Sequence, residues 1–204
     1  MNYLAFDTSG NYLTVLARGS KEKLVKTEEC THSHSVILMP EIEKCLFEVG
    51  LKLEDVDVFA CSVGPGSFTG IRIGVATAKA FAYALSKKVL AVTSFESLAY
   101  NVLEKVKKLT VIDARHDNFY VAGFDENNEV IILPCFKTKQ EIIDLSKGFY
   151  LISDGEIDGV SSLKADLFEG FKRAVEAKLN LASDDIETLV PLYVKKSQAE
   201  EEAC

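Results

Sequence analysis

The sequence has no tryptophan and five cysteines among its 204 residues, and no two of these cysteines form a C-x-x-C pair. The cysteines are widely spaced, at Cys30, Cys45, Cys61, Cys135 and Cys204. An odd number at such spacing argues against both a disulfide framework and a zinc ribbon, so we expect a reduced, cytoplasmic protein. No run of 18 apolar residues is free of charge, so we expect no membrane-spanning helix.

Positive charge is also scarce. The chain carries 23 lysine and arginine residues against 31 aspartate and glutamate residues, which gives a net charge of −8. An acidic surface repels the phosphates of a nucleic acid. We therefore do not expect this chain to bind RNA or DNA tightly by itself.

Histidine is too sparse to suggest a metal centre. The three histidines are His32, His34 and His116, and none belongs to an H-E-x-x-H motif or a similar pair four residues apart. In an extended segment, His32 and His34 would point to opposite sides. We expect no metal site.

The glycine-rich stretch VGPGSFTG, residues 63–70, lacks both common nucleotide-binding patterns. Gly64 and Gly70 are six residues apart and precede Ile71-Arg72, so the lysine and hydroxyl of a P-loop are missing. The dinucleotide pattern G-x-G-x-x-G fails by one residue. Ser67 is a good helix N-cap, and the helix start behind it could attract an anion. The alternative is a tight turn whose glycines let a strand and a helix pack closely.

The helix predicted over residues 67–86 carries small side chains at every fourth position. Gly70, Gly74, Ala78 and Ala82 form this ridge, and the other faces of the helix are also largely apolar. Such a helix is buried on more than one side. It lies either between two layers of its own domain or against a partner, and the shortness of the chain favours the partner.

Asp7-Thr8-Ser9 lies at the end of the strand predicted over residues 2–8. An acidic residue at a strand end faces a metal or phosphate in some proteins, and in others it accepts hydrogen bonds from the backbone of its own turn. Asp113 occupies the same position after a later strand, and both alternatives apply to it. The candidate cofactor-contacting residues are therefore Asp7, Thr8, Ser9, Gly64, Gly66 and Ser67.

The predicted elements occur twice along the chain. Strands over 2–8, 12–18 and 22–29 precede a helix ending at Gly50, a strand over 56–63 and the helix over 67–86. A second set starts with LTVID at 109–113 and ends with an amphipathic helix whose apolar residues include Phe171 and Val175. Aligning Asp7 with Asp113 places Val15 on Val121. The repeated order β-β-β-α-β-α predicts an α/β protein with two ribonuclease-H-like halves and mixed sheets.

Several segments together make the chain resemble the bacterial TsaB (YeaZ) family. They are FDTSGNYLTVLA, HSHSVILMPEIEKCL, VGPGSFTGIRIGVATAKAFAYAL, VTSFESLA, DARHDNFYVAGF and PLYVKK. The resemblance implies an ASKHA fold, related to actin and Hsp70, with an N-terminal lobe over 1–107 and a smaller C-terminal lobe over 108–204. It also implies a scaffold or activating subunit of the machinery that makes threonylcarbamoyladenosine (t6A) in tRNA.

In that family the TsaB-like member is non-catalytic, pairs with its paralogue TsaD or with itself through N-lobe helices, and helps recruit TsaE. TsaD-like relatives hold a metal through H-x-x-x-H, which HSHSVILMP lacks, so the resemblance implies no catalytic residue and no cofactor. Contact with tRNA would be indirect. The residues expected at the partner interface are Leu38, Ile42, Cys45, Gly70, Gly74, Ala78, Phe81 and Ala82.

Two enzyme functions remain as alternatives. One is an ASKHA nucleotide-dependent phosphotransferase or hydrolase that uses Asp7, Asp113 and the loop at 64–67. The other is a metallopeptidase-like enzyme, which would require a bound zinc or iron ion.

Overall fold

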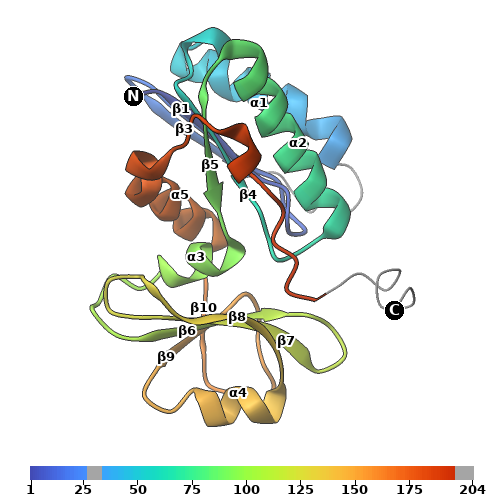
Figure 1. Ribbon diagram of the computed structural model, residues 1–204, viewed down its shortest axis with the longest axis vertical. Coiled ribbons are helices and arrows are strands. Elements are labelled where there is room, and N and C mark those ends of the chain that lie inside the picture. Colours follow the sequence, from blue (N-terminus) through green and yellow to red (C-terminus); the bar gives the residue numbers. More distant parts are fainter. Residues whose placement is uncertain (27–33, 196–204) are drawn as a thin grey trace.

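The computed structural model describes residues 1–26 and 34–195, in two lobes that each contain a five-stranded mixed sheet (Figure 1). The α/β class and the two-lobed ASKHA fold predicted from the sequence are confirmed. The end of the predicted third strand (27–29), Cys30, His32 and Cys204 lie outside the described residues.

The first sheet has the order β3-β2-β1-β4-β5. Its strands are β1 (Tyr3–Asp7), β2 (Thr14–Arg18), β3 (Glu22–Lys26), β4 (Val58–Ser62) and β5 (Lys88–Val92). β2 runs antiparallel to β1 and β3, whereas β4 is parallel to β1 and β5. All of β4 and the first four residues of β1 are buried, because helices cover both faces of these central strands.

The second sheet repeats this topology, with β6 (Lys108–Asp113) at its centre and the order β10-β9-β6-β7-β8. Its other strands are β7 (Asn118–Phe124), β8 (Val130–Thr138), β9 (Tyr150–Ser153) and β10 (Leu163–Lys164). β7 is antiparallel to β6 and β8, and β9 is parallel to β6 and β10. The predicted internal repeat is therefore confirmed at the level of strand order and direction.

The alignment predicted between the two halves is one residue out after the first turn. Val15 lies opposite Phe6 in the first sheet. In the second sheet, Ile112 corresponds to Phe6, and Tyr120 lies opposite Ile112. Val15 thus corresponds to Tyr120 and not to Val121, because the second hairpin has one residue fewer between its paired ends.

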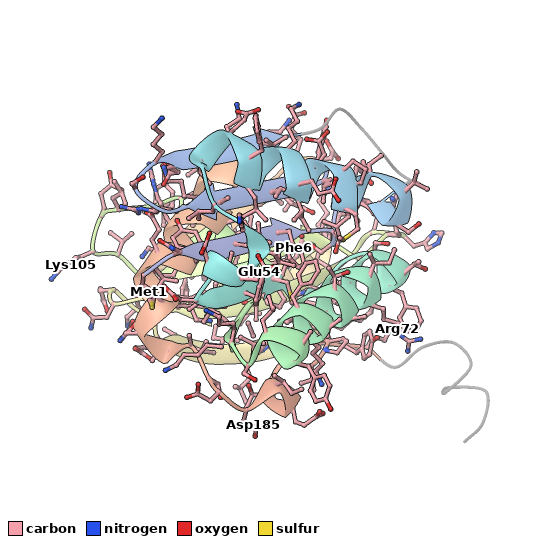
Figure 2. All side chains as sticks on the ribbon, turned by 90° about the horizontal axis from the view of Figure 1, so that it is seen from above. Met1, Phe6, Glu54, Arg72, Lys105 and Asp185 are labelled. Carbon is pink, nitrogen blue, oxygen red and sulfur yellow. The ribbon has the colours of Figure 1, made fainter. Side chains whose placement is uncertain are left out.

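Helices α1 (His34–Val49) and α2 (Phe68–Leu85) lie side by side on one face of the first sheet (Figures 1 and 2). α3 (Ser94–Ala99) lies between the two sheets, and α4 (Lys139–Leu145) covers the far face of the second. Short 3-10 helices span Leu53–Asp55, Leu179–Leu181 and Ile186–Thr188. Pro40 lies inside α1.

The second half lacks a helix at the position that α2 occupies in the first half. Residues 154–162, which join β9 to β10, contain no helix. The predicted amphipathic helix is α5 (Leu167–Lys178), which follows β10 and returns to the first sheet. There, Phe171 and Val175 pack on the face opposite α1 and α2. The predicted boundary between residues 107 and 108 falls directly before β6. Helix α5 comes after this boundary in the sequence but packs against the first lobe.

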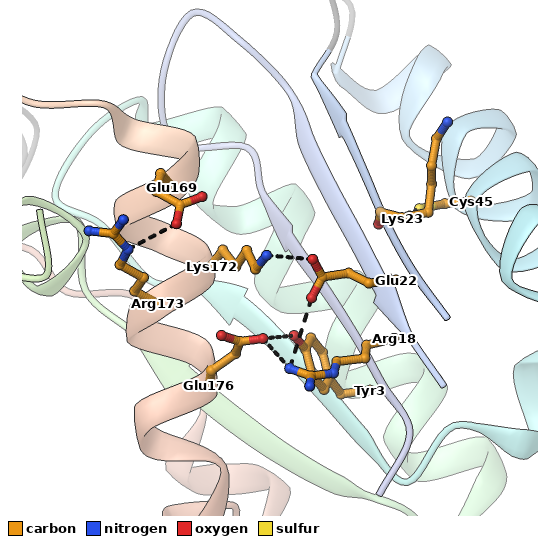
Figure 3. Close-up of polar contacts among 9 residues, drawn as sticks. All are labelled: Tyr3, Arg18, Glu22, Lys23, Cys45, Glu169, Lys172, Arg173 and Glu176. Atoms are coloured by element: carbon orange, nitrogen blue, oxygen red, sulfur yellow. Dashed lines mark hydrogen bonds and ion pairs between the residues drawn. The ribbon is translucent and has the colours of Figure 1, made fainter. Parts of the chain in front are cut away.

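Polar contacts also join α5 to the first sheet (Figure 3). The Tyr3 hydroxyl donates to Glu176 Oε1 at 3.2 Å, and Arg18 pairs with the same carboxylate. Glu22 pairs with Lys172 of α5 and lies 3.9 Å from Arg18. Burial, and next the charge of Glu176, raise the pKa of Tyr3, which therefore stays protonated as a donor. The network fixes the position of α5 along the sheet.

Candidate functional site

The turn that follows β1 lies directly beneath the glycine-rich loop and the first turns of α2. Thr8 is fully buried and Ser9 is 7% exposed. The Ser67 amide donates to the Ser9 carbonyl at 2.7 Å, and Thr8 Oγ1 donates to the Gly70 carbonyl at 2.7 Å. A Cβ on Gly66 would overlap Ser9, because the two backbones touch. The glycines thus allow a very close approach of strand and helix, which was one of the two alternatives for this loop.

Positions 70 and 74 of α2 require glycine for the same reason. A Cβ on Gly70 would overlap the Thr8 carbonyl, and one on Gly74 would lie 2.6 Å from Thr8 Oγ1. Ser67 Oγ accepts a hydrogen bond from the Gly70 amide at 3.2 Å, which confirms the predicted N-cap. Gly64 adopts φ of +96°, a conformation that favours glycine.

Asp7 stabilises its own turn. Its Oδ1 accepts a hydrogen bond from the Ser9 amide at 2.7 Å. Burial raises the pKa of the Asp7 carboxyl, while hydrogen bonds from Ser9 and Ser62 and the charge of His34 oppose the rise. This geometry matches the turn-forming alternative for Asp7.

Three serine hydroxyls meet beside Asp7. The Oγ atoms of Ser9, Ser62 and Ser94 lie 3.3 to 3.4 Å from one another. Ser62 ends β4 and Ser94 follows β5; β4 is the parallel neighbour of β1, and β5 is the parallel neighbour of β4. The carboxyl ends of parallel strands meet at one edge of a sheet. This rule was the signal available in the sequence, but sequence reasoning did not include Ser62 and Ser94 among the candidates.

His34, the first residue of α1, is only 6% exposed, and its Nε2 has no hydrogen-bond partner among the described residues. Its charge acts on Asp7. Within residues 1–26 and 34–195, no three His, Cys, Asp or Glu side chains are close enough to share a metal ion. The polar side chains gathered beside Asp7 are therefore the three serine hydroxyls and the His34 imidazole.

The corresponding turn of the second lobe is built differently. Asp113 Oδ1 accepts from the Arg115 amide at 2.7 Å, and the Asp113 amide donates to Asp154 Oδ1 at 3.2 Å. Arg115, His116 and Asp117 all have left-handed backbone conformations, with φ of 72°, 55° and 56°. Asp113 therefore also accepts a hydrogen bond within its own turn.

The structure places seven of the eight residues predicted at a partner interface inside the protein's own core. Leu38, Ile42, Cys45, Gly70, Gly74, Ala78 and Ala82 are buried, and Phe81 is half-buried. The ridge of small side chains faces the first sheet, where Gly74 lies next to Phe6 and Thr8 of β1 and its turn. These residues hold α1 and α2 on the sheet, so a partner would meet other side chains.

The opposite sides of the two helices are exposed and carry several apolar side chains among polar ones. We call this surface the outer face of α1 and α2. On α1, Val36, Met39 and Phe47 are 72%, 41% and 85% exposed. On α2, Tyr83 is 78% exposed, and the alanines at 76, 80 and 84 are exposed at a spacing of four. Figure 2, seen from above, shows the two helices side by side, with Arg72 pointing away from the core.

Two lobes whose five-stranded mixed sheets share one strand order, with a glycine-rich loop pressed on the turn after β1, define an ASKHA-type α/β protein. The family model described as "TsaD: tRNA N6-adenosine threonylcarbamoyltransferase" matches residues 23–158. The chain belongs to this family and, within it, to the TsaB (YeaZ) proteins.

Individual comparisons agree with this assignment. The chain is 28% identical over 174 residues to tRNA threonylcarbamoyladenosine biosynthesis protein TsaB of Buchnera aphidicola subsp. Schizaphis graminum, covering 79% of this chain and 83% of that one. The protein of the same name from Bacillus subtilis is 34% identical over 135 residues, which are 64% of this chain and 58% of that one. The structure of YeaZ from Pseudomonas aeruginosa superimposes with a TM-score of 0.78 at 23% identity, covering 94% and 99% of the two chains.

In the part of the chain that the structure describes, no helix combines the length and apolar character needed to cross a membrane.

Proposed function

We propose that this protein is a non-catalytic scaffold subunit in the biosynthesis of threonylcarbamoyladenosine in tRNA, and that it binds TsaD and helps recruit TsaE. The names of the TsaB relatives support the pathway. The outer face of α1 and α2 supports the binding role. Since the chain has a net charge of −8, the partners would contact the tRNA phosphates.

The outer face has the properties of a surface that a helical partner covers. Phe47 and Tyr83 expose most of their side chains on neighbouring helices, and soluble proteins rarely group large apolar side chains on an open face without a use for them. The exposed alanines of α2 leave room for another helix to approach closely. Exposed aromatic residues such as Phe47 and Tyr83 are typical anchors of protein interfaces. The same features suit a second copy of the chain.

Phe47→Asp and Ala80→Arg, tested separately, are expected to weaken pairing with TsaD by at least about 30-fold, since a central aromatic anchor contributes about 2 kcal/mol or more. Both positions are exposed, so the isolated variants are expected to remain folded. Titration calorimetry with purified TsaD measures the affinity, and gel filtration of the chain alone measures self-association. Retention of TsaE by the preformed pair tests recruitment.

Leu133→Asp is the matched control for this experiment. Leu133 is 78% exposed on β8 of the second lobe, away from α1 and α2, so its replacement is expected to leave pairing unchanged. Wild-type affinity in both outer-face variants would contradict the proposed interface. Equal weakening by all three variants would place the contact outside α1 and α2.

ATP with magnesium is expected to give no measurable binding heat with the isolated chain. The turn after β1, which would face a phosphate, is covered by Gly66 and Gly70, and Thr8 is fully buried beneath them. Calorimetry checks this result, with isolated TsaD and the pair as comparison samples. Micromolar binding by the isolated chain would favour the phosphotransferase or hydrolase alternative instead.

A further inference from the structure

Residues 189–195 run from one lobe to the other, and we call this segment the strap. Leu189 is fully buried in the core between the first sheet and α1 and α2. Leu192 packs against both that core and the apolar cluster between the lobes, and its amide donates to the Val63 carbonyl at 2.8 Å. Val194 packs only in the cluster between the lobes. The apolar contacts of the strap therefore pass from the core of the first lobe to the cluster between the two lobes.

A polar and aromatic contact ties the strap to the first turns of α2. Arg72 Nε donates to the Tyr193 hydroxyl at 2.8 Å. The Arg72 guanidinium also lies 3.8 Å from the centre of the Phe68 ring, and the Phe68 and Tyr193 rings are 5.2 Å apart. A planar guanidinium can stack on a ring and donate hydrogen bonds at the same time. Arg72 thus holds both rings together.

The other end of the strap meets the second sheet. Lys195 Nζ lies 5.2 Å from the centre of the Phe136 ring on β8, and Phe136 packs against Tyr120 of β7 with 5.9 Å between ring centres. Tyr120 and Tyr193 line a small cavity of about 150 Å³ between the strap and the loop at 65–68. The strap therefore starts in the core of the first lobe and ends on the second sheet.

We infer that the strap fixes the angle between the two lobes, so that the outer face of α1 and α2 and the second lobe move as one rigid body. Hinge motion is the ordinary behaviour of two lobes joined by a modest interface. Here the contacts of Arg72, Tyr193 and Leu192 oppose that motion. These contacts lie within the single chain and need no partner.

Tyr193→Ala in the full chain tests this inference by two measurements. Hydrogen exchange followed by mass spectrometry is expected to show roughly tenfold faster exchange in residues 189–195, with β1 unchanged, because a charged hydrogen bond and a ring contact are lost. Fluorescence energy transfer between dyes on non-natural residues at Lys44 and Lys147, one in each lobe, is expected to show a broader distance distribution.

Tyr150→Ala is the control, because Tyr150 on β9 is 47% exposed and Tyr193 is 42% exposed. It is expected to change neither measurement. An unchanged distance distribution in Tyr193→Ala would overturn the inference, as would exchange that accelerates equally throughout both lobes. If Tyr193→Ala does not fold, the same two measurements are made on Arg72→Lys, which keeps the charge and removes the planar stack. An unchanged distance distribution, or exchange that accelerates equally in both lobes, would again overturn the inference.

Discussion

The Ala78→Arg variant is expected to lose more than about 4 kcal/mol of folding stability, a large part of the 5 to 15 kcal/mol typical of a protein. Ala78 is fully buried in the core beneath α2. An arginine there would either bury an unpaired charge or push α2 off the sheet. Circular dichroism during urea unfolding measures the loss.

Ala80→Arg supplies the matched control, because Ala80 is exposed on the same helix only two residues further along. This variant is expected to unfold within about 0.5 kcal/mol of the wild type. A stable Ala78→Arg protein would show that α2 is free to rotate on the sheet. In that case the ridge of small residues could reach a partner after all.

Phe171→Ala is expected to destabilise the protein by about 3 to 5 kcal/mol. Phe171 is fully buried and fills the face of the first sheet opposite α1 and α2, where it packs in the cluster that contains Tyr3 and Val58. Removing its ring would leave a cavity between two elements that lie far apart in the sequence. Urea unfolding gives the free energy, and hydrogen exchange in β1 and β2 shows whether the first lobe is the part that opens.

Phe47→Ala is the control for Phe171→Ala, since it removes the same ring from a site that is 85% exposed. We expect it to change the free energy of unfolding by no more than about 0.5 kcal/mol. A loss below about 1 kcal/mol in Phe171→Ala would mean that α5 contributes little to the first lobe.

The sequence pattern predicted most strands and helices because they carry strong local periodicity. The same pattern could not say which side of α2 faces the sheet. A spacing of four residues defines the ridge at Gly70, Gly74 and Ala78, but both a partner helix and the protein's own strand can use such a ridge. The close approach of Thr8 decides between them, and that contact joins residues more than 60 positions apart.

The polar site was predictable in part. Asp7 and Ser9 follow a recognisable buried strand, so they were found. Ser62 and Ser94 join them only because β1, β4 and β5 are parallel neighbours. The contact between Arg72 and Tyr193 has no local pattern at all, since it depends on the path of the chain after α5. The missing helix between β9 and β10 likewise breaks a repeat that the strands obey.

The return of α5 to the first sheet affects the order in which the molecule can be completed during its synthesis. A ribosome releases β1 to β5 first, but one face of this sheet remains without its covering helix until residues 167–178 have emerged. Domains that are continuous in sequence can fold as each one leaves the ribosome. Here the lobe that is synthesised first finishes folding last, with the apolar side chains of Leu16 and Val58 uncovered while the entire second sheet is being made.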